Sequence, residues 1–478
     1  MLKKILNTTL VIPCFFIFSS DQSKSSELKS NDPISIEERF SRKYIEFKNI
    51  PEIVKNNNFE LKALEKMVMA ASFNLRSSIG KRHPSVDLSA TGLPQYLYGK
   101  NYSSNSVNTK SSQLKANPAL TIRWDLINPS RGPEIEIAQN NLEIAINNYE
   151  IKKNDLVQEA KSRYHSYQKS YAEVNNAIIL VDLSSKILKD AQSKLEAGIG
   201  TEFDVLEANA QLARDTEFLE EKKISRDIDK ISLKEVLNIN FAKDLEISKE
   251  QKLLGFWNYS LNTNIDKGIK NSFSLRNLTL QSLIKDNQSK SFKNSNKPVI
   301  YISNTISSSF TKGSSLTAEI DPNKYGSNYS NTLSLNFSWN IFDGNQNYNS
   351  SKAKESESEA DKYNYKNIEK ILKKNISETY LNLKKFENKI VATKKEIIST
   401  TESLRLAKLR YEVGVSTLKD VLTRQTELSD AKSKNINSIY NYNINLNKLE
   451  RITFQKISED CLMNKIDKKN QINSICNY

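Results

Sequence analysis

The sequence has few of the residues that interrupt regular structure and few of those that bind metals. Among 478 residues there are 12 glycines and 10 prolines, well below average usage, which argues against a loop-rich sandwich, a collagen or a low-complexity chain. Two histidines and three cysteines nearly exclude a zinc cluster or a histidine-based hydrolase. No acidic pair stands in an apolar setting that would suggest acid–base catalysis. We therefore expect long helices, no enzymatic activity, and no metal or other cofactor.

The excess of positive charge does not by itself identify a partner. Lys and Arg together number 70 against 56 for Asp and Glu, which gives a net charge of +14. Such an excess can indicate nucleic-acid binding. However, no run of basic residues is long enough to form a polybasic patch, and Lys, Asn, Ile and Ser are abundant along the whole chain. We expect no nucleic-acid partner.

The first twenty residues have the pattern of an export signal. Two lysines near the start are followed by a short apolar run that ends at Phe18, and then by small residues. This pattern is typical of a secretory signal peptide, here over 1–20. Cys14 could instead be a lipid-attachment cysteine, but Pro13 before it is not the small residue that such a site needs. No later stretch of 18 apolar residues occurs, so we expect no transmembrane helix.

The chain repeats itself at a nearly constant separation. Three pairs of equivalent residues lie 214, 215 and 216 residues apart, namely Pro84 and Pro298, Trp124 and Trp339, and Gly198 and Gly414. A constant offset of this kind predicts an internal duplication. We place the first structural repeat at 21–255, the second at 256–460 and a C-terminal tail at 461–478. Cys461 and Cys476 of the tail could form a disulfide in an oxidising compartment or remain free thiols.

Each repeat contains a very long helix followed by a shorter one that returns. Apolar residues recur at a seven-residue spacing, which predicts coiled-coil helices over 133–195 and 345–411. The recurring residues are Tyr167, Val174, Val181, Leu188 and Leu195 in the first helix and Leu383, Ile390, Ile397, Leu404 and Tyr411 in the second. Gly198 and Gly414 follow, where a helix end favours a left-handed residue. The returning helices are expected over about 201–240 and 417–455. Short helices are expected before the strands, around 61–75 and 273–284.

Two strands are expected in each repeat, before the long helix. Apolar and polar residues alternate over 85–90, 120–126 and 333–341, and less regularly over 298–306. Polar loops are expected over 94–117 and 310–331. Strands of about nine residues with this alternation cross a bilayer in a β-barrel. Lipid-facing and lumen-facing sets are then predicted, the first being Ile122, Trp124, Leu335 and Phe337 and the second Arg123, Asp125, Asn336 and Ser338.

Four strands cannot close a barrel, because small barrels need about eight. Open sheet edges are not tolerated in lipid, so several copies must share one barrel, and a trimer supplies twelve strands. One alternative is a soluble four-stranded sheet on a helical stalk. The corresponding functional alternative is an exported structural coiled coil, such as a surface fibre or an envelope tether.

The two segments around the glycines resemble a known family. Residues 195–206 (LEAGIGTEFDVL) and 411–422 (YEVGVSTLKDVL) are similar to the hairpin tips of TolC-like outer-membrane efflux proteins. The resemblance implies an α+β membrane protein of the outer membrane with a large periplasmic part. In such a protein each chain has a long α-helical coiled-coil part, which forms a tunnel, and four transmembrane β-strands. A homotrimer completes the strands of its three chains as a 12-stranded β-barrel.

The resemblance also implies a function and partners. The function is that of an outer-membrane channel, the exit duct of a tripartite efflux or type I secretion system, which passively conducts small molecules or polypeptides. The partners are two further copies of the chain, outer-membrane lipid, a periplasmic adaptor (membrane fusion) protein, and an inner-membrane transporter of the RND, ABC or MFS type.

Several site residues follow from the resemblance. Periplasmic tip positions that contact the adaptor correspond to Gly198, Thr201, Gly414 and Thr417. Gate positions correspond to three further residues: Asp204 and Tyr411 match a pair that holds neighbouring hairpins shut, and Asp420 matches an aspartate that rings the entrance.

Two positions depart from the family pattern. Ser416 stands where well-studied members carry a gate-latching arginine, and Thr423 stands where a second ring aspartate is common. The latch is therefore expected to be weaker or differently built, and the ring less acidic.

Overall fold

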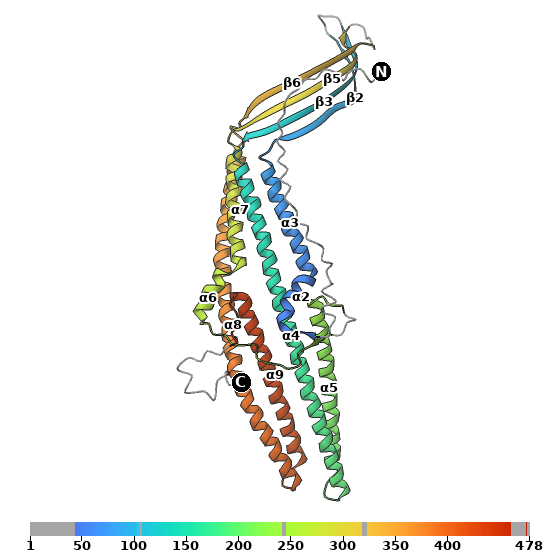
Figure 1. The fold of residues 1–478 in the computed structure, drawn as a ribbon, viewed down its shortest axis with the longest axis vertical. Helices are drawn as coiled ribbons and strands as arrows, with labels where there is room; N and C mark the ends of the chain where they lie inside the picture. Colours follow the sequence, from blue (N-terminus) through green and yellow to red (C-terminus); the bar gives the residue numbers. More distant parts are fainter. Residues whose placement is uncertain are drawn as a thin grey trace, which may run out of the picture.

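The computed structural model describes residues 44–102, 104, 108–240, 245–317, 323–459 and 475. The expected signal peptide and the three cysteines, Cys14, Cys461 and Cys476, lie outside the described residues. The described part is an elongated rod of helices that carries a curved sheet at one end (Figure 1).

The same succession of five elements occurs twice along the chain. The first set is α3 (Phe59–Gly80), β2 (Ser85–Asn101), β3 (Thr109–Ile127), α4 (Arg131–Glu196) and α5 (Glu202–Val236). The second set is α7 (Phe273–Ser295), β5 (Val299–Thr317), β6 (Tyr325–Ser338), α8 (Gln346–Glu412) and α9 (Leu418–Thr453). The expected order of helix, two strands and helical hairpin is therefore present in both halves.

Short elements that the sequence analysis did not predict lie at the middle of the rod. They are η1 (Phe47–Asn49), α2 (Ile50–Asn57), α6 (Leu261–Lys270) and two strands of two residues each, β1 (Tyr44–Ile45) and β4 (Glu246–Ile247). The strands β1 and β4 pair in parallel. Together with α2 they pack apolar side chains against α4 and α5.

The long helices begin and end within two residues of the predicted bounds. Val174, Leu383 and Ile390 of the predicted seams are buried, as the seven-residue spacing requires. Lower on α4 the prediction is partly wrong, because Leu195 is exposed and the buried line there runs through Ser184, Ile187 and Ala191. The physical reason is that α4 packs between α5 and α9 and so buries side chains toward two neighbours.

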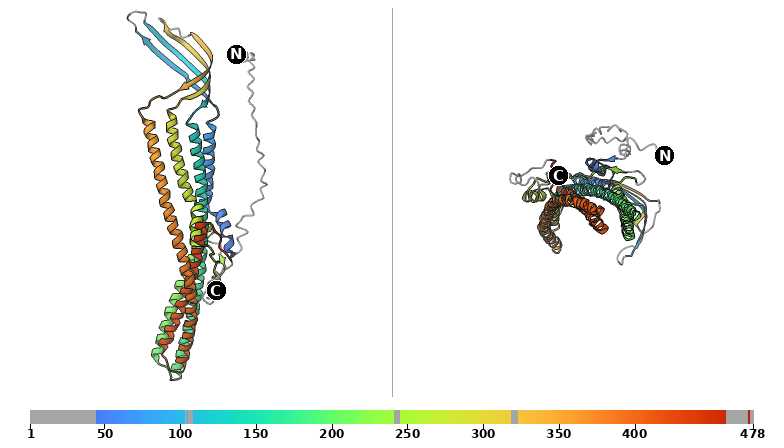
Figure 2. Two further views of the ribbon diagram at one scale, coloured as in Figure 1. Left: turned by 90° about the vertical axis from the view of Figure 1, so that its left-hand side faces the viewer. Right: turned by 90° about the horizontal axis from the view of Figure 1, so that it is seen from below.

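The helices lie side by side in one curved layer. In the upper part the order is α3, α4, α7, α8, and in the lower part it is α5, α4, α9, α8. Viewed along the rod, this layer forms an arc (Figure 2). Among the described residues, no helix combines the length and the apolar character that crossing a membrane requires.

The four long strands form one antiparallel sheet in the order β2, β3, β5, β6. They are 17, 19, 19 and 14 residues long, so the predicted length of nine and the predicted loops over 94–117 and 310–331 are wrong. Backbone pairing needs no apolar face, so the polar ends continue the ladder instead of forming loops. Pro94 is accommodated at a register shift between Thr91 and Gln95, where it removes no ladder hydrogen bond.

His165, one of the two histidines, is buried in the middle of the rod. Its ring lies 5.0 Å from the ring of Phe47 and 5.9 Å from that of Tyr164, and its Nδ1 is 3.1 Å from Oε1 of Gln168. Burial lowers the pKa of His165 to about 4, from 6.5. The side chain is therefore a neutral part of the apolar packing.

This burial predicts that acid destabilises the fold. The unfolded chain binds a proton at His165 near pH 6.5 and the native protein only near pH 4, so the free energy of unfolding falls as the pH drops through this interval. The full effect is roughly 3 kcal/mol. Thermal midpoints measured across the interval should decline less in His165→Gln than in the wild type. His83→Gln, at an exposed histidine, is the matched control and should decline like the wild type. An equal decline in His165→Gln and His83→Gln would contradict the assignment.

Candidate functional site

The end of the rod away from the sheet consists of two hairpin turns with the same backbone. Gly198 and Gly414 adopt left-handed φ values of 74° and 76°, which favour glycine. The carbonyl of Lys194 accepts from the amides of Ile199 and Gly200. The equivalent carbonyl of Arg410 accepts from Val415 and Ser416. Each turn thus satisfies the last carbonyls of a long helix and reverses the chain.

The returning helices begin with the same cap. Thr201 Oγ1 accepts from the amide of Asp204, and Thr417 Oγ1 accepts from the amide of Asp420, at 3.1 and 3.3 Å. At the second tip Ser416 Oγ also donates to the Asp420 carboxylate over 2.6 Å. This hydroxyl, with the amide and hydroxyl of Thr417, lowers the pKa of Asp420. Ser416 therefore holds the carboxylate of Asp420 at its own turn.

A contact between Lys194 and Tyr411 joins the two tips. The ammonium of Lys194 lies 3.8 Å from the ring centroid of Tyr411 and donates to its carbonyl over 2.8 Å. Burial, with the nearby carboxylates of Asp204 and Asp190, raises the pKa of the Tyr411 phenol. The carboxylate of Asp204 accepts from Thr201 Oγ1 at 2.9 Å. The pairing of Asp204 with Tyr411 across hairpins stays a prediction.

Sequence reasoning missed Lys194. Lys194 and Arg410 are 216 residues apart, the separation of the two tip glycines, so both are the basic residue four positions before the turn. This equivalence was the available signal. It did not show that Lys194 reaches the other hairpin, because that depends on how the hairpins pack.

An apolar cluster lies directly above the tips and includes all four helices of the two hairpins. Its buried members are Ile187, Ala191, Ala208, Leu404, Leu418, Val421 and Leu422. Because both hairpins contribute, the tips cannot separate within one chain without exposing apolar surface.

A buried polar cluster follows above it. Asp215 on α5 is only 5% exposed and accepts from Ser184 of α4 and from Gln425 of α9. Gln211 Nε2 donates to its other oxygen over 2.9 Å. Burial raises the pKa of Asp215, and the hydrogen bonds oppose that shift. A carboxylate therefore connects the two hairpins at a level where apolar packing would be expected.

A second polar contact between α4 and α9 lies higher. Asn176 Nδ2 donates to the carbonyl and the hydroxyl of Ser429, at 3.1 and 3.2 Å, and to Ser433 Oγ at 3.2 Å. Ser433 in turn donates to Glu173 over 2.7 Å. The interface between the hairpins is thus apolar at the tips and hydrogen-bonded above them.

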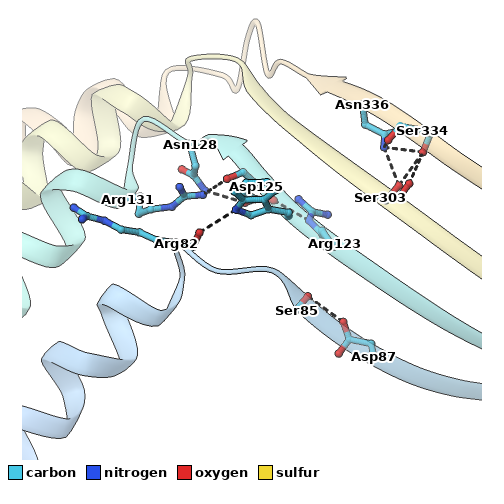
Figure 3. Close-up of polar contacts among 11 residues, drawn as sticks. Arg82, Ser85, Asp87, Arg123, Asp125, Asn128, Arg131, Ser303, Ser334 and Asn336 are labelled. Atoms are coloured by element: carbon cyan, nitrogen blue, oxygen red, sulfur yellow. Dashed lines mark hydrogen bonds and ion pairs between the residues drawn. The ribbon is translucent and has the colours of Figure 1, made fainter. Parts of the chain in front are cut away.

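The sheet at the opposite end has one polar and one apolar face. Ser334 and Asn336 are half-buried, while Leu333, Leu335 and Phe337 between and beside them are exposed. On the polar face Asn336 Nδ2 donates to Ser303 Oγ over 2.9 Å (Figure 3). The predicted alternation is present over 333–337, and Ile122 and Trp124 of the predicted lipid-facing set are exposed. Exposure does not alternate along β2 or β5, and Arg123 and Ser338 of the predicted lumen-facing set are exposed as well.

Charged residues of the polar face are paired at the base of the sheet. Arg123 Nε lies 3.0 Å from Asp125 Oδ1, and its guanidinium lies 3.8 Å from the ring centroid of Tyr301. Asn128 also donates to Asp125, and Arg131 donates to the Asp125 carbonyl over 2.7 Å (Figure 3). This network links the strand to the start of α4.

The two tryptophans of the duplication make equivalent hydrogen bonds. Trp124 Nε1 donates to the carbonyl of Arg82 over 3.0 Å, and Trp339 Nε1 donates to that of Asn296 over 2.9 Å. Both carbonyls lie two residues before a proline that precedes a strand. Each indole therefore ties the end of one strand to the connection that starts its neighbour.

Comparison with known proteins relates these features to one family. Residues 50–238 and 304–453 match the profile described as outer membrane efflux protein. No curated protein matches the chain.

Solved structures share its fold. The CmeC outer membrane channel of Campylobacter jejuni has 15% identity and a TM-score of 0.71 over 90% of both chains. VceC, an outer membrane protein of Vibrio cholerae, has 12% identity and a TM-score of 0.72 over 87% of this chain and 97% of its own. The outer-membrane channel OprN has 14% identity and a TM-score of 0.72 over 85% and 89%.

The buried carboxylate predicts a second pH dependence, opposite in sign to that of His165. Because the pKa of Asp215 is raised, the native protein binds this proton more tightly than the unfolded chain, and stability falls as the pH rises above about 3.8 through the raised value. Asp215→Asn should remove this fall in the thermal midpoint. Asp215→Leu should lower the midpoint at every pH, because Ser184 and Gln425 lose their partner. Asp182→Asn, on the exposed surface, is the control, and unchanged pH slopes in Asp215→Asn would refute the assignment.

Proposed function

Because the chain belongs to the outer membrane efflux protein family, we propose that it is the exit duct of a tripartite efflux or type I secretion system. The duct conducts small molecules or polypeptides passively across the outer membrane, in which proteins of this family reside. The observation that carries the proposal is the single arc of helices continued by a curved sheet (Figure 2), one face of which is polar. Several such arcs side by side enclose a polar passage.

The sheet supports a trimer because its two edges have no partner within the described chain. Strands β2 and β6 are at the ends of the order β2, β3, β5, β6. In lipid an unpaired edge is costly, so β2 of one copy must pair with β6 of the next. Three copies supply twelve strands, enough to close a barrel around the polar face.

The helices supply a second unpartnered surface. Ile224, Ile228 and Ile231 recur on one side of α5, the helix at one end of the lower arc, and all three are exposed. Their spacing of three and four residues places them on one face. An apolar stripe at the end of the arc fits burial against α8 of the next copy.

The tips supply the contact with other proteins of the system. Residues around Gly198, Thr201, Gly414 and Thr417 form the free end of the rod, where a periplasmic adaptor protein binds in this proposal. The adaptor connects the duct to an inner-membrane transporter of the RND, ABC or MFS type, which supplies the energy.

The same tips form the gate. In a ring of six hairpins the Tyr411 hydroxyl donates to Asp204, and Lys194 fixes the Tyr411 ring from the neighbouring hairpin of the same chain. Three copies of Asp420 surround the entrance, each held in place by Ser416. In this gate the hairpins are held together by the phenol of Tyr411 and the carboxylate of Asp204, and Lys194 positions the phenol. The latching arginine of other family members is absent, because Ser416 occupies its position.

The proposal predicts a trimer that depends on the α5 stripe. Protein purified in detergent from outer-membrane fractions should have three times the mass of one chain by light scattering. Ile228→Glu buries a charge in the contact between copies and should shift the protein toward monomers. Ile199→Glu, on an exposed residue of the tip turn, is the matched control. A monomer that retains its strand content would contradict the shared barrel.

The gate predicts specific changes in conductance. In planar bilayers without an adaptor, Asp204→Ala and Tyr411→Phe should each raise single-channel conductance. The double variant should have a conductance close to that of either single variant, because each change already removes the shared hydrogen bond. Lys194→Met should also raise conductance, since it frees the Tyr411 ring. Asp420→Asn should instead lower the preference for cations, because it removes charge from the ring.

Asp182→Ala is the control for the gate variants, since Asp182 pairs with Lys186 on the exposed surface of α4. Conductance and selectivity that stay at the wild-type values in every gate variant would show that the constriction lies elsewhere.

A further inference from the structure

Three lysines lie on the apolar face of the sheet, at the end far from the helices. They are Lys100 of β2, Lys110 of β3 and Lys312 of β5, and all three side chains are exposed. Exposed tyrosines surround them, namely Tyr96, Tyr98 and Tyr325. We refer to these six residues as the lysine surface.

The pairing of the strands places these residues on one face. Lys100 is directly opposite Lys110. Leu114, on the same face of β3 as Lys110, is opposite Tyr96 on one side and Lys312 on the other. Lys312 is in turn opposite Tyr325. Residues opposite each other in an antiparallel pair share a face. A side-chain contact agrees, since the Tyr96 hydroxyl lies 3.2 Å from Ser112 Oγ, two residues from Lys110 on the same strand.

The described strands place no acidic residue on the face that carries the lysine surface. In the four strands the acidic residues are Asp87 and Asp125, and both lie on the polar face, opposite Thr121 and Tyr301. Asp125 is already paired with Arg123. Like charges directly opposite in a sheet repel each other, so a bound anion stabilises the Lys100 and Lys110 pair.

Lys110, with Lys100 opposite it, lies at the depth of the headgroup layer of a bilayer. Lys312 pairs with Leu114, about 10 Å nearer Trp124, and its long side chain extends toward the headgroups. From Trp124 to Lys110, β3 rises ~3.4 Å per residue, which at a barrel tilt of ~40° is about 36 Å along the membrane normal. The hydrocarbon core is about 30 Å thick and the bilayer with its headgroups about 40–45 Å. With Trp124 at one interface, Lys110 reaches the headgroups of the opposite leaflet, and tyrosines are typical of that boundary.

We propose that Lys100, Lys110 and Lys312 bind the phosphorylated headgroup of an anionic lipid in the outer leaflet. The lysine ammonium groups neutralise the phosphate, and the tyrosines hold the upper part of the acyl chains. This inference rests on the proposed function, because it requires the sheet to be part of a barrel in a membrane. It assigns to the outer surface of that barrel a preference for one class of lipid.

The test compares lipid retention by the intact trimer. Full-length protein is reconstituted into vesicles of phosphatidylcholine alone or mixed with phosphatidylglycerol, extracted in mild detergent, and examined by native mass spectrometry for bound lipid. The wild type should retain phosphatidylglycerol preferentially. K100Q/K110Q should bind it roughly 30-fold more weakly, since each lysine near an anionic lipid contributes about fivefold.

Two further variants provide the controls. K115Q removes a lysine from the other face of β3 and should retain the lipid like the wild type. K100R/K110R keeps both charges and should restore retention. Equal retention by the wild type and K100Q/K110Q, or an equal loss in K115Q, would overturn the proposal.

A third measurement separates lipid from free anion. Inorganic phosphate added to lipid-free trimer should not raise the thermal midpoint, and a rise as large as that caused by phosphatidylglycerol would show a free-anion site instead of a lipid surface. Insertion as a trimer without lipid preference would reject the lipid contact but leave the proposed function standing. Failure to insert into either vesicle would contradict both.

Discussion

Two long, unbroken helices form the framework against which the shorter helices of this chain pack. Helices α4 and α8, of 66 and 67 residues, run the length of the rod, and the shorter helices lie against them in pairs above and below the middle. Side chains repeating at seven-residue spacing provide that packing, with Leu383 and Ile390 fully buried on α8. Each of the shorter helices is in contact with at least one of these two.

The interface between the hairpins is built in layers that differ in chemistry. Apolar side chains such as Leu404 and Leu418 meet at the tips, and hydrogen-bonded groups around Asp215 and Asn176 follow above them. Separating the apolar layer exposes surface to water, whereas the polar groups can exchange their partners for water at small net cost. Separating the two hairpins at the tips would therefore work mainly against the apolar layer.

The sheet joins the rod through contacts that the duplication uses twice. Trp124 and Trp339 each hydrogen-bond to the connection that precedes the neighbouring strand, β2 or β5. Arg123 and Asp125 link β3 to the start of α4. The indoles are on the apolar face and the ion pair is on the polar face, so both faces are anchored at the base.

Local patterns determined a large part of this fold, and packing decided the rest. The seven-residue spacing, the tip glycines and the alternation near Trp124 and Leu335 act through neighbouring residues, so the long helices, the turns and the two faces of the strands could be predicted. The outer ends of the strands could not, because Ser, Thr and Asn pair as well through their backbone as they form loops. Contacts such as Lys194 with Tyr411, or Ser184 with Asp215 and Gln425, join residues that are distant in the chain. Only the tertiary structure decides them, since they depend on the lateral order of the helices, which no local pattern specifies.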